Sequence, residues 1–230
     1  MQAMPRFPNG FVWQDEDDIH YREFLIQRIS SRLRADLCAL NPAIDMMRVE
    51  TPCLVPADFV KAHQAAEFPV YSIGGEDGLY LRPESTSSTY AMFRELFPKT
   101  EMLQKRLPFC IWQANMSFRE EQDKTFKNLR FKQFWQMEFQ LAYREGTKAD
   151  YHQWAVKSLY DLFATLFQNR ELRLDKLAGE SLPFYSSRTT DIYLDQWEVV
   201  AISDRKDFDF PILEVSCGLD RLVALIRRTV

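Results

Sequence analysis

Hydrophobic and polar residues alternate along two neighbouring segments in the middle of the chain, which predicts a long antiparallel hairpin over residues 109–143. The first arm has apolar or small residues at its even positions: Cys110, Trp112, Ala114, Met116 and Phe118. The second arm has them at its odd positions: Phe131, Trp135, Met137, Phe139 and Leu141. Because successive side chains of a strand point to opposite faces, each arm has one core face and one polar face.

The polar face of this hairpin carries the candidate chemistry. When the arms pair with their core faces together, five side chains converge on the other face: Arg119, Glu121, Arg130, Phe134 and Glu138. Cations, carboxylates and one aromatic ring then share a surface, and residues 123–128 form the loop at the tip. Taken alone, the hairpin is more typical of a half-solvated sheet with ordinary surface charges.

The rest of the chain mixes helical and strand patterns. Helices are expected at 15–40, 57–68, from about 82 to 97, and at 147–169, the last capped by Thr147 and Asp150. Strands are expected at 46–54, 70–73, 79–81, 191–202 and 211–217. The last strand is followed by Gly218 and a helix. Residues 172–178 are expected to form a short strand or a loop. These elements predict an α+β fold with a mainly antiparallel sheet backed by helices.

Length and composition indicate one globular domain over residues 1–230, with 46% apolar and 27% charged residues. No glycine-rich phosphate loop occurs, so a nucleotide would have to be held by side chains on strands. The net charge of −4 gives no support for strong nucleic-acid binding, although a local basic patch around Arg119 and Arg130 remains open.

Cysteine spacing and hydropathy indicate the compartment. The four cysteines form no C-x-x-C pair and only three histidines accompany them, so free thiols in a reducing cytoplasm are expected rather than a zinc site. The acidic N-terminus has no apolar signal region, and no stretch is long and apolar enough to span a membrane. A cytoplasmic location is therefore expected.

The spacing within the hairpin resembles motif 2 of class II aminoacyl-tRNA synthetases: Phe118-Arg119-x-Glu121, then a charged loop, then Arg130-x-x-x-Phe134-x-x-x-Glu138. Three further segments resemble this family in the same order, and most closely the glycyl-tRNA synthetases: residues 46–54 with Pro52 (motif 1), Leu81-Arg82-Pro83-Glu84, and Glu214-x-Ser216-x-Gly218-x-Asp220-Arg221 (motif 3). Two departures stand out. Ser87–Thr89 stands where the family has A-Q-G. Glu198 directly follows Trp197, whereas the family has one residue between the tryptophan and the acid, and this leaves the role of Glu198 open.

The resemblance implies an ATP-dependent ligase that activates glycine, or another very small amino acid, as an aminoacyl-adenylate. It assigns the α-phosphate and the substrate carboxylate to Arg119, the γ-phosphate to Arg130, and the adenine to Phe134 and Arg221, with Glu121 orienting the adenine amino group. The substrate ammonium group is assigned to Glu84, Glu138, Glu214 and Ser216. Mg²⁺ would bridge the phosphates, with Glu214 as its candidate ligand. The catalytic set is then Arg119, Glu121, Arg130 and Arg221.

Motif 1 further implies a homodimer through residues 20–55. Phe210 runs directly into Pro211 and the sequence ends at Val230, so the chain is expected to lack an anticodon-binding domain. Three possibilities stay open. The chain activates an amino acid for a carrier protein, a small molecule or a tRNA end. Alternatively, it is a tRNA ligase whose recognition domain is supplied by another chain, or a non-catalytic relative such as an accessory subunit of a DNA polymerase.

Overall fold

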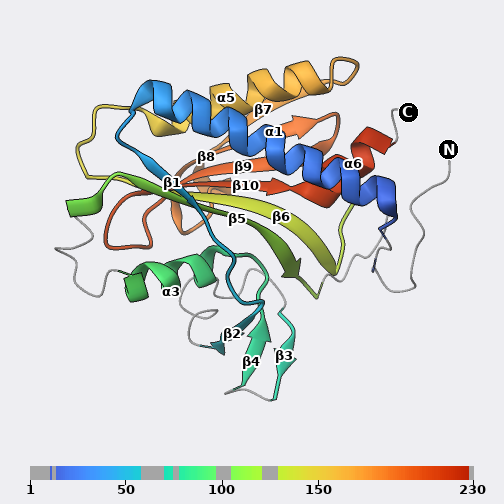
Figure 1. Cartoon of the computed structure of the whole chain (residues 1–230), viewed down its shortest axis with the longest axis horizontal. Coiled ribbons are helices and arrows are strands. Elements are labelled where there is room, and N and C mark those ends of the chain that lie inside the picture. The colour runs from blue at the N-terminus through green and yellow to red at the C-terminus, as the bar shows by residue number, and fades with distance from the viewer. Residues whose placement is uncertain are drawn as a thin grey trace.

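The centre of the molecule is a seven-stranded sheet (Figure 1). The computed structural model describes residues 11, 14–57, 70–74, 78–96, 105–120 and 129–227. Across the sheet, the strands follow the order β1 (Asp45–Arg48), β5 (Phe109–Phe118), β6 (Gln133–Ala142), β10 (Ile212–Gly218), β9 (Trp197–Arg205), β8 (Ser186–Leu194) and β7 (Leu172–Leu177). β1 pairs in parallel with β5, and all other neighbours are antiparallel. The predicted α+β fold with a mainly antiparallel sheet is confirmed.

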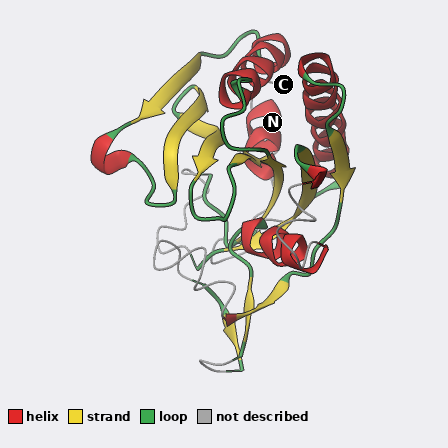
Figure 2. Cartoon of the chain, turned by 90° about the vertical axis from the view of Figure 1, so that its left-hand side faces the viewer, coloured by secondary structure: helices red, strands yellow, loops and turns green. Residues whose placement is uncertain are grey.

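Helices cover both faces of this sheet unequally (Figures 1 and 2). One face carries α1 (Glu16–Leu40), α5 (Tyr151–Leu166) and α6 (Leu219–Arg227). The opposite side carries α3 (Thr86–Leu96) and a small sheet of β2 (Leu54–Pro56), β4 (Leu79–Leu81) and β3 (Ser72–Ile73). A short 3-10 turn, η2 (Gly179–Ser181), follows β7. Among the described residues, no helix combines the length and the apolar character needed to cross a membrane.

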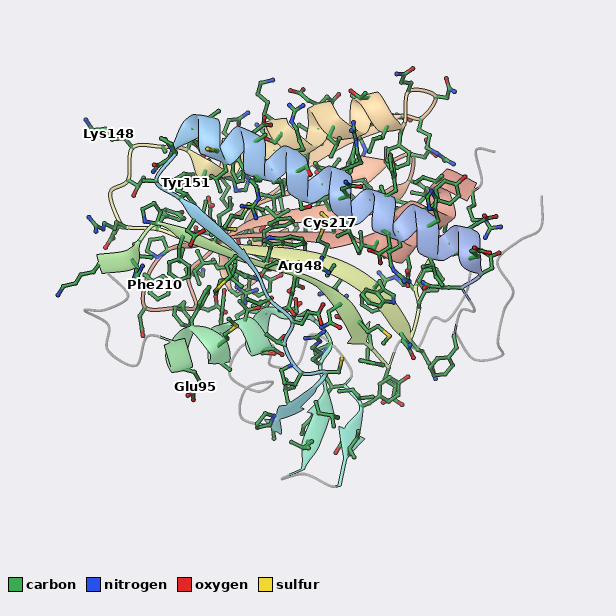
Figure 3. The ribbon with its side chains drawn as sticks, viewed as in Figure 1. Arg48, Glu95, Lys148, Tyr151, Phe210 and Cys217 are labelled. Atoms are coloured by element: carbon green, nitrogen blue, oxygen red, sulfur yellow. The ribbon has the colours of Figure 1, made fainter. Side chains whose placement is uncertain are left out.

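The alternating pattern of the hairpin sets the two faces of the sheet as predicted. Cys110 pairs with Leu141, Trp112 with Phe139, and Ala114 with Met137, all in the core beneath the helices. Figure 3 shows side chains filling this layer, with Cys217 of β10 inside it. A smaller apolar cluster on the other face joins Tyr90 and Phe93 of α3 to Phe109, Ile111 and Ile212. The polar side chains of β6 and β10 therefore lie on the α3 side of the sheet.

Local signals explain where the helices begin. Asp15 caps α1 through a reciprocal capping box with Asp18, and Asn41 ends the helix just before Pro42. The predicted cap of the 147–169 helix is only half right. Asp150 is the N-cap, since its carboxylate accepts a hydrogen bond from the backbone N–H of Gln153 at 3.0 Å, whereas the hydroxyl of Thr147 binds the carbonyl of Arg144.

The predicted strand over residues 191–202 is wrong, because these residues belong to two strands, β8 and β9, joined by a tight turn at Asp195 and Gln196. Asp195 has a φ of +54°, which asparagine and aspartate tolerate better than most residues. Its carboxylate binds Arg170 and accepts a hydrogen bond from the backbone N–H of Glu171 at 3.1 Å. These contacts fix the turn from a neighbouring segment, which strand alternation alone does not reveal.

Two further boundaries differ from the sequence-based expectation. The strand over 46–54 is divided into β1 and β2, because the carbonyls of Thr51 and Pro52 accept hydrogen bonds from the Arg82 guanidinium instead of a neighbouring strand. The helix after Pro83 begins only at Thr86. The 172–178 segment is the edge strand β7, and the paired strands at 70–73 and 79–81 are present as β3 and β4. The helix expected at 57–68 lies, apart from residue 57, outside the described residues.

Candidate active site

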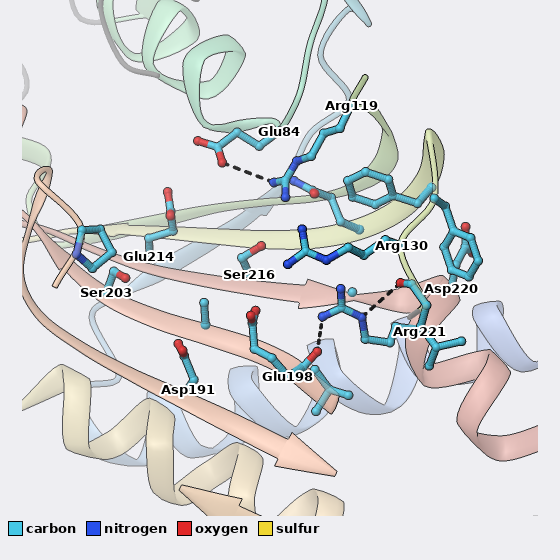
Figure 4. Close-up of a pocket in the computed structure, with 18 of the residues that line it drawn as sticks. Glu84, Arg119, Arg130, Asp191, Glu198, Ser203, Glu214, Ser216, Asp220 and Arg221 are labelled. Atoms are coloured by element: carbon cyan, nitrogen blue, oxygen red, sulfur yellow. Dashed lines mark hydrogen bonds and ion pairs between the residues drawn. The ribbon is translucent and has the colours of Figure 1, made fainter. Parts of the chain in front are cut away.

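A cavity of about 410 Å³ opens on the polar face of the sheet. Seven of the residues predicted for the site line it: Glu84, Arg119, Arg130, Phe134, Glu214, Ser216 and Arg221. They come from the segment before α3, the ends of the β5–β6 hairpin, β10 and the first turn of α6. Figure 4 shows Arg119, Arg130 and Arg221 directed into one space from these separate segments. The structure therefore brings together residues that are up to 137 positions apart, Glu84 to Arg221.

Arg119 sits just beyond the end of β5, where its backbone N–H donates to the carbonyl of Lys132 at 2.9 Å and continues the hairpin pairing. Its Nε donates to the carbonyl of Pro83 at 3.0 Å, and its Nη2 lies 3.8 Å from Oε2 of Glu84. The guanidinium also lies 5.3 Å from the centre of the Phe134 ring. A carbonyl, a carboxylate and an aromatic ring thus hold a planar cation at the cavity wall.

Arg221 is fixed by the start of α6. Its Nε lies 3.4 Å from the carbonyl of Leu129, and its Nη1 donates to the carbonyl of Glu198. The neighbouring Asp220 accepts from the backbone N–H of Trp135 at 2.9 Å and from Nε2 of Gln14 at 2.6 Å. Burial raises the pKa of Asp220 to about 6, an effect that these donors oppose. Asp220 therefore anchors the helix that presents Arg221.

Glu214 lies at the floor of the cavity and is only 6% exposed. Nη1 of Arg205 lies 3.1 Å from its Oε1 and 2.9 Å from its Oε2. Oε2 also accepts hydrogen bonds from Thr86 Oγ1 and Gln140 Nε2, each at 2.8 Å. A carboxylate with this many donors is held in one orientation.

Glu138 occupies a different place from the one the sequence suggests. It is 2% exposed and does not line the cavity that the described residues form. Its two carboxylate oxygens accept hydrogen bonds from Ser85 Oγ and Gln136 Nε2. Desolvation, followed by the charges of Glu84 and Glu214, raises the pKa of Glu138 from 4.5 to about 8. Glu138 therefore lies buried behind the cavity wall and favours the protonated form near neutral pH.

Arg205 and Asp207 support the site through Glu214, although the sequence predicted no role for either residue. The side chain of Arg205 is fully buried; its Nε and Nη2 donate to the two oxygens of Asp207 at 3.0 and 2.6 Å, while Nη1 binds Glu214. Its guanidinium lies 4.1 Å from the centre of the Tyr185 ring. The available signal was Glu214 itself, since a carboxylate in an otherwise apolar strand needs a buried partner. The sequence does not say which of the 29 basic residues is that partner.

Asp191 and Glu198 form an acidic wall on the side of the cavity away from Glu84 (Figure 4). The pairing of β8 with β9 is irregular between Ile192 and Tyr193, so that Val199 has no opposite residue. This bulge turns Glu198 toward the cavity although it directly follows Trp197. Burial, followed by the charge of Glu198, raises the pKa of Asp191 to about 7. Glu121 lies outside the described residues, so its predicted role is not tested.

Residues 70–228 match the family described as tRNA synthetase class II core domain (G, H, P, S and T). The chain belongs to this family. The match covers β3 to α6 and so includes every described residue that lines the cavity. Among the described residues, no group of three or more His, Cys, Asp and Glu side chains is arranged to hold a metal ion.

Curated relatives of this class II core are glycine–tRNA ligases. The ligase of Thermobifida fusca (strain YX) is 30% identical over 154 residues, which is 63% of this chain and 33% of the relative. The ligase of Clostridium beijerinckii is 31% identical over 147 residues, which is 62% of this chain and 31% of the relative. The ligase of Clostridium perfringens is 32% identical over 136 residues, which is 57% of this chain and 28% of the relative. The chain spans about a third of the length of these relatives. The predicted resemblance to class II and glycyl-tRNA synthetases is confirmed.

Proposed function

We propose that this class II core activates an amino acid with ATP, forming an aminoacyl-adenylate and releasing pyrophosphate. The observation that carries the proposal is one cavity that joins three arginines, an aromatic ring and buried carboxylates. In this reaction, an oxygen of the substrate carboxylate attacks the α-phosphorus and the bond to the pyrophosphate oxygen breaks. Both reactants are anionic, so fixed cations that hold them in line lower the barrier.

The site residues predicted from the sequence have the following roles in this proposal. Arg119 takes an α-phosphate oxygen and the substrate carboxylate, since its planar fork is already held by Pro83 and Glu84. Arg130 takes the γ-phosphate. Phe134 and Arg221 enclose the adenine ring by stacking and cation–π attraction, and Glu121 orients its amino group. No general base is needed, because the attacking carboxylate is already ionised.

Mg²⁺ would neutralise and bridge the phosphates of ATP. The predicted ligand, Glu214, fits this role poorly, because its carboxylate already binds Arg205, Thr86 and Gln140. Asp191 and Glu198 fit better. Both line the cavity, and Oδ1 of Asp191 is buried without a hydrogen-bond partner among the described residues. One or two carboxylates together with substrate phosphates are a usual binding set for Mg²⁺.

The substrate is glycine or another very small amino acid. Glu84 and Glu214, with Ser216 beside them on β10, face the cavity and provide oxygens for an ammonium group, while Glu138 lies directly behind. A larger apolar side chain placed against these carboxylates would remove their hydration without supplying a partner. The glycine–tRNA ligase relatives support the same assignment.

The acceptor of the activated amino acid is a tRNA end, a carrier protein or another molecule, and residues 1–230 act as a single catalytic domain in the cytoplasm. Four free cysteines support a reducing compartment.

A non-catalytic accessory role, as in a polymerase subunit, is the alternative. Retention of Arg119, Arg130 and Arg221 around one cavity argues against it, because a scaffold does not need converging cations.

We also propose a homodimer through residues 20–55. Four large apolar side chains on α1 and β1 are substantially exposed: Ile19 (45%), directly before this region, and Phe24 (40%), Leu40 (44%) and Met47 (41%) within it. Burial of these side chains against a second copy in a twofold dimer would remove their apolar area from water. Light scattering of the wild type and of Phe24→Glu at micromolar concentrations tests it: a monomeric wild type contradicts the dimer.

Amino-acid-dependent exchange of pyrophosphate into ATP tests the proposed activity. The purified chain is assayed with each of the twenty amino acids, and glycine is expected to give the highest rate. Glycine, alanine, serine and proline are then compared quantitatively. Activation of alanine or a larger residue at least about tenfold better than glycine would contradict the glycine assignment while leaving the adenylation chemistry intact. No exchange with any amino acid would favour the accessory role.

A further inference from the structure

The beginning of α3 touches two buried glutamates that lie on different strands. Ser85, directly before the helix, donates its hydroxyl hydrogen to Oε2 of Glu138 on β6. Thr86, the first helical residue, donates from Oγ1 to Oε2 of Glu214 on β10 at 2.8 Å. Both hydroxyl residues are buried, with exposures of 2% and 0%. Two consecutive residues therefore fix one carboxylate each.

The two carboxylate oxygens of Glu214 accept different numbers of hydrogen bonds. Oε2 accepts from Thr86, from Gln140 at 2.8 Å and from Arg205 at 2.9 Å, which saturates its lone pairs. Among the described residues, Oε1 accepts from Arg205 alone, at 3.1 Å. Only Oε1 retains the capacity to accept a further hydrogen bond from a ligand in the cavity.

We infer that Ser85 and Thr86 are positioning residues for the amine of the substrate, acting through Glu138 and Glu214 respectively. This inference rests on the proposed function, since it takes the amine of the amino acid as the ligand of Glu214. Thr86 holds Oε2 against α3 and so presents Oε1 to the cavity. Ser85 holds the carboxyl group of Glu138 directly behind the cavity wall that Glu84 and Glu214 line.

The position of Thr86 makes its contribution separable from ATP binding. Thr86 does not line the cavity that the described residues form, and it contacts Glu214 rather than Arg119, Phe134 or Arg221. Loss of its hydroxyl leaves Oε2 with two donors and lets the carboxylate turn, so that Oε1 no longer faces the amine in a single orientation. The expected result is weaker amino-acid binding with unchanged ATP binding.

Thr86→Val tests this directly, because valine preserves the branched shape and removes only the hydroxyl. In pyrophosphate exchange, the KM for glycine should rise at least about tenfold, the effect of losing a hydrogen bond to a charged group, while the KM for ATP stays within about twofold. Thr86→Ser, which retains the hydroxyl, should restore the wild-type KM for glycine. Ser85→Ala should also raise the KM for glycine without altering the KM for ATP.

Thr190→Val is the matched control. Thr190 is also a buried threonine bound to a titratable side chain, with Oγ1 2.9 Å from Nε2 of His152, but it faces α5 on the other side of the sheet. The KM values of the Thr190→Val variant for glycine and for ATP should equal those of the wild type. Circular dichroism and urea unfolding confirm that each variant is folded before its kinetics are compared.

The outcomes separate this inference from the proposed function. An active wild type with an unchanged KM for glycine in folded Thr86→Val overturns the inference and leaves the proposed function in place. An equal rise in the KM for ATP also overturns it, because that result indicates general disruption of the cavity. A wild type without exchange activity overturns both. A crystal structure of Thr86→Val with Glu214 turned away from the wild-type orientation supports the inference independently of activity.

Discussion

Arg205 and Glu214 form a buried ion pair, with Nη1 of Arg205 2.9 Å from Oε2 of Glu214, and the two residues lie on adjacent strands of the central sheet. Asp207 binds the other edge of the same guanidinium at 2.6 Å. Although burial disfavours its charged form, the surrounding carboxylates raise the pKa of Arg205 well above its usual value. Arg205 therefore stays ionised, and its contacts with Glu214 and Asp207 fix the floor of the cavity.

Replacement of Arg205 should destabilise the fold strongly. Arg205→Met leaves Glu214 and Asp207 without their cation in a buried site, and removal of one partner of such a pair costs about 3–5 kcal/mol. Urea unfolding measures this loss. Arg188→Met is the matched control, because Arg188 also binds two carboxylates, Asp150 and Asp204, but its side chain is 47% exposed. The control should lose about 1 kcal/mol or less. Equal losses in the two variants would contradict a buried, ionised Arg205.

Arg119 should be essential for activation but not for folding. Arg119→Ala removes a cation held at the cavity wall by Glu84 and Pro83. Loss of one phosphate contact should cost about 2–4 kcal/mol in the transition state, or roughly 30- to 1000-fold in the rate of pyrophosphate exchange. Arg173→Ala on the edge strand β7 serves as the control for loss of a surface cation. A folded Arg119→Ala with an unchanged rate would remove Arg119 from the mechanism.

Phe134 should contribute mainly to ATP binding. Stacking of a base on an aromatic side chain is worth about 1–3 kcal/mol, so Phe134→Ala should raise the KM for ATP roughly 5- to 150-fold. Phe184→Ala is the control, since Phe184 is 51% exposed and does not line the cavity that the described residues form. A change in the KM for glycine alone, with that for ATP unaffected, would place the adenine elsewhere.

Glu138 should make stability fall as the pH rises through the neutral range. Its folded-state pKa of about 8 lies above its ordinary value of 4.5, so between these values the folded chain keeps a proton that the unfolded chain has released. The free energy of unfolding should therefore decrease from about pH 4.5 to about pH 8 through this group, and should be independent of it outside that window. Urea unfolding at several pH values measures the slope.

Glu138→Gln supplies the control for that slope. The neutral amide resembles the protonated acid, so the variant should lose the decrease contributed by Glu138 and gain stability relative to the wild type as the pH approaches 8. An identical pH dependence in both proteins would show that Glu138 is ionised in the folded state throughout this range.

Much of the fold follows from the sequence by itself. Alternation along residues 109–118 and 133–142 determines which side chains of β5 and β6 enter the core, because a strand directs neighbouring side chains to opposite faces. The same rule places Glu214 and Ser216 on one face of β10. The motif resemblance also predicts one site for Arg119, Phe134 and Arg221, and all three line the cavity.

Only the tertiary structure decided how the buried charges are paired. The contacts of Glu214 with Arg205 and Thr86 cross 9 and 128 positions, and strand alternation says nothing about which donor reaches a given carboxylate. The same holds for the turn at Asp195, fixed by Arg170, and for the bulge that turns Glu198 toward the cavity. Local pattern sets the face of each side chain, because it depends on backbone geometry. The partner, protonation state and orientation of each buried charged side chain depend on groups that folding brings together, so only the tertiary structure determines them.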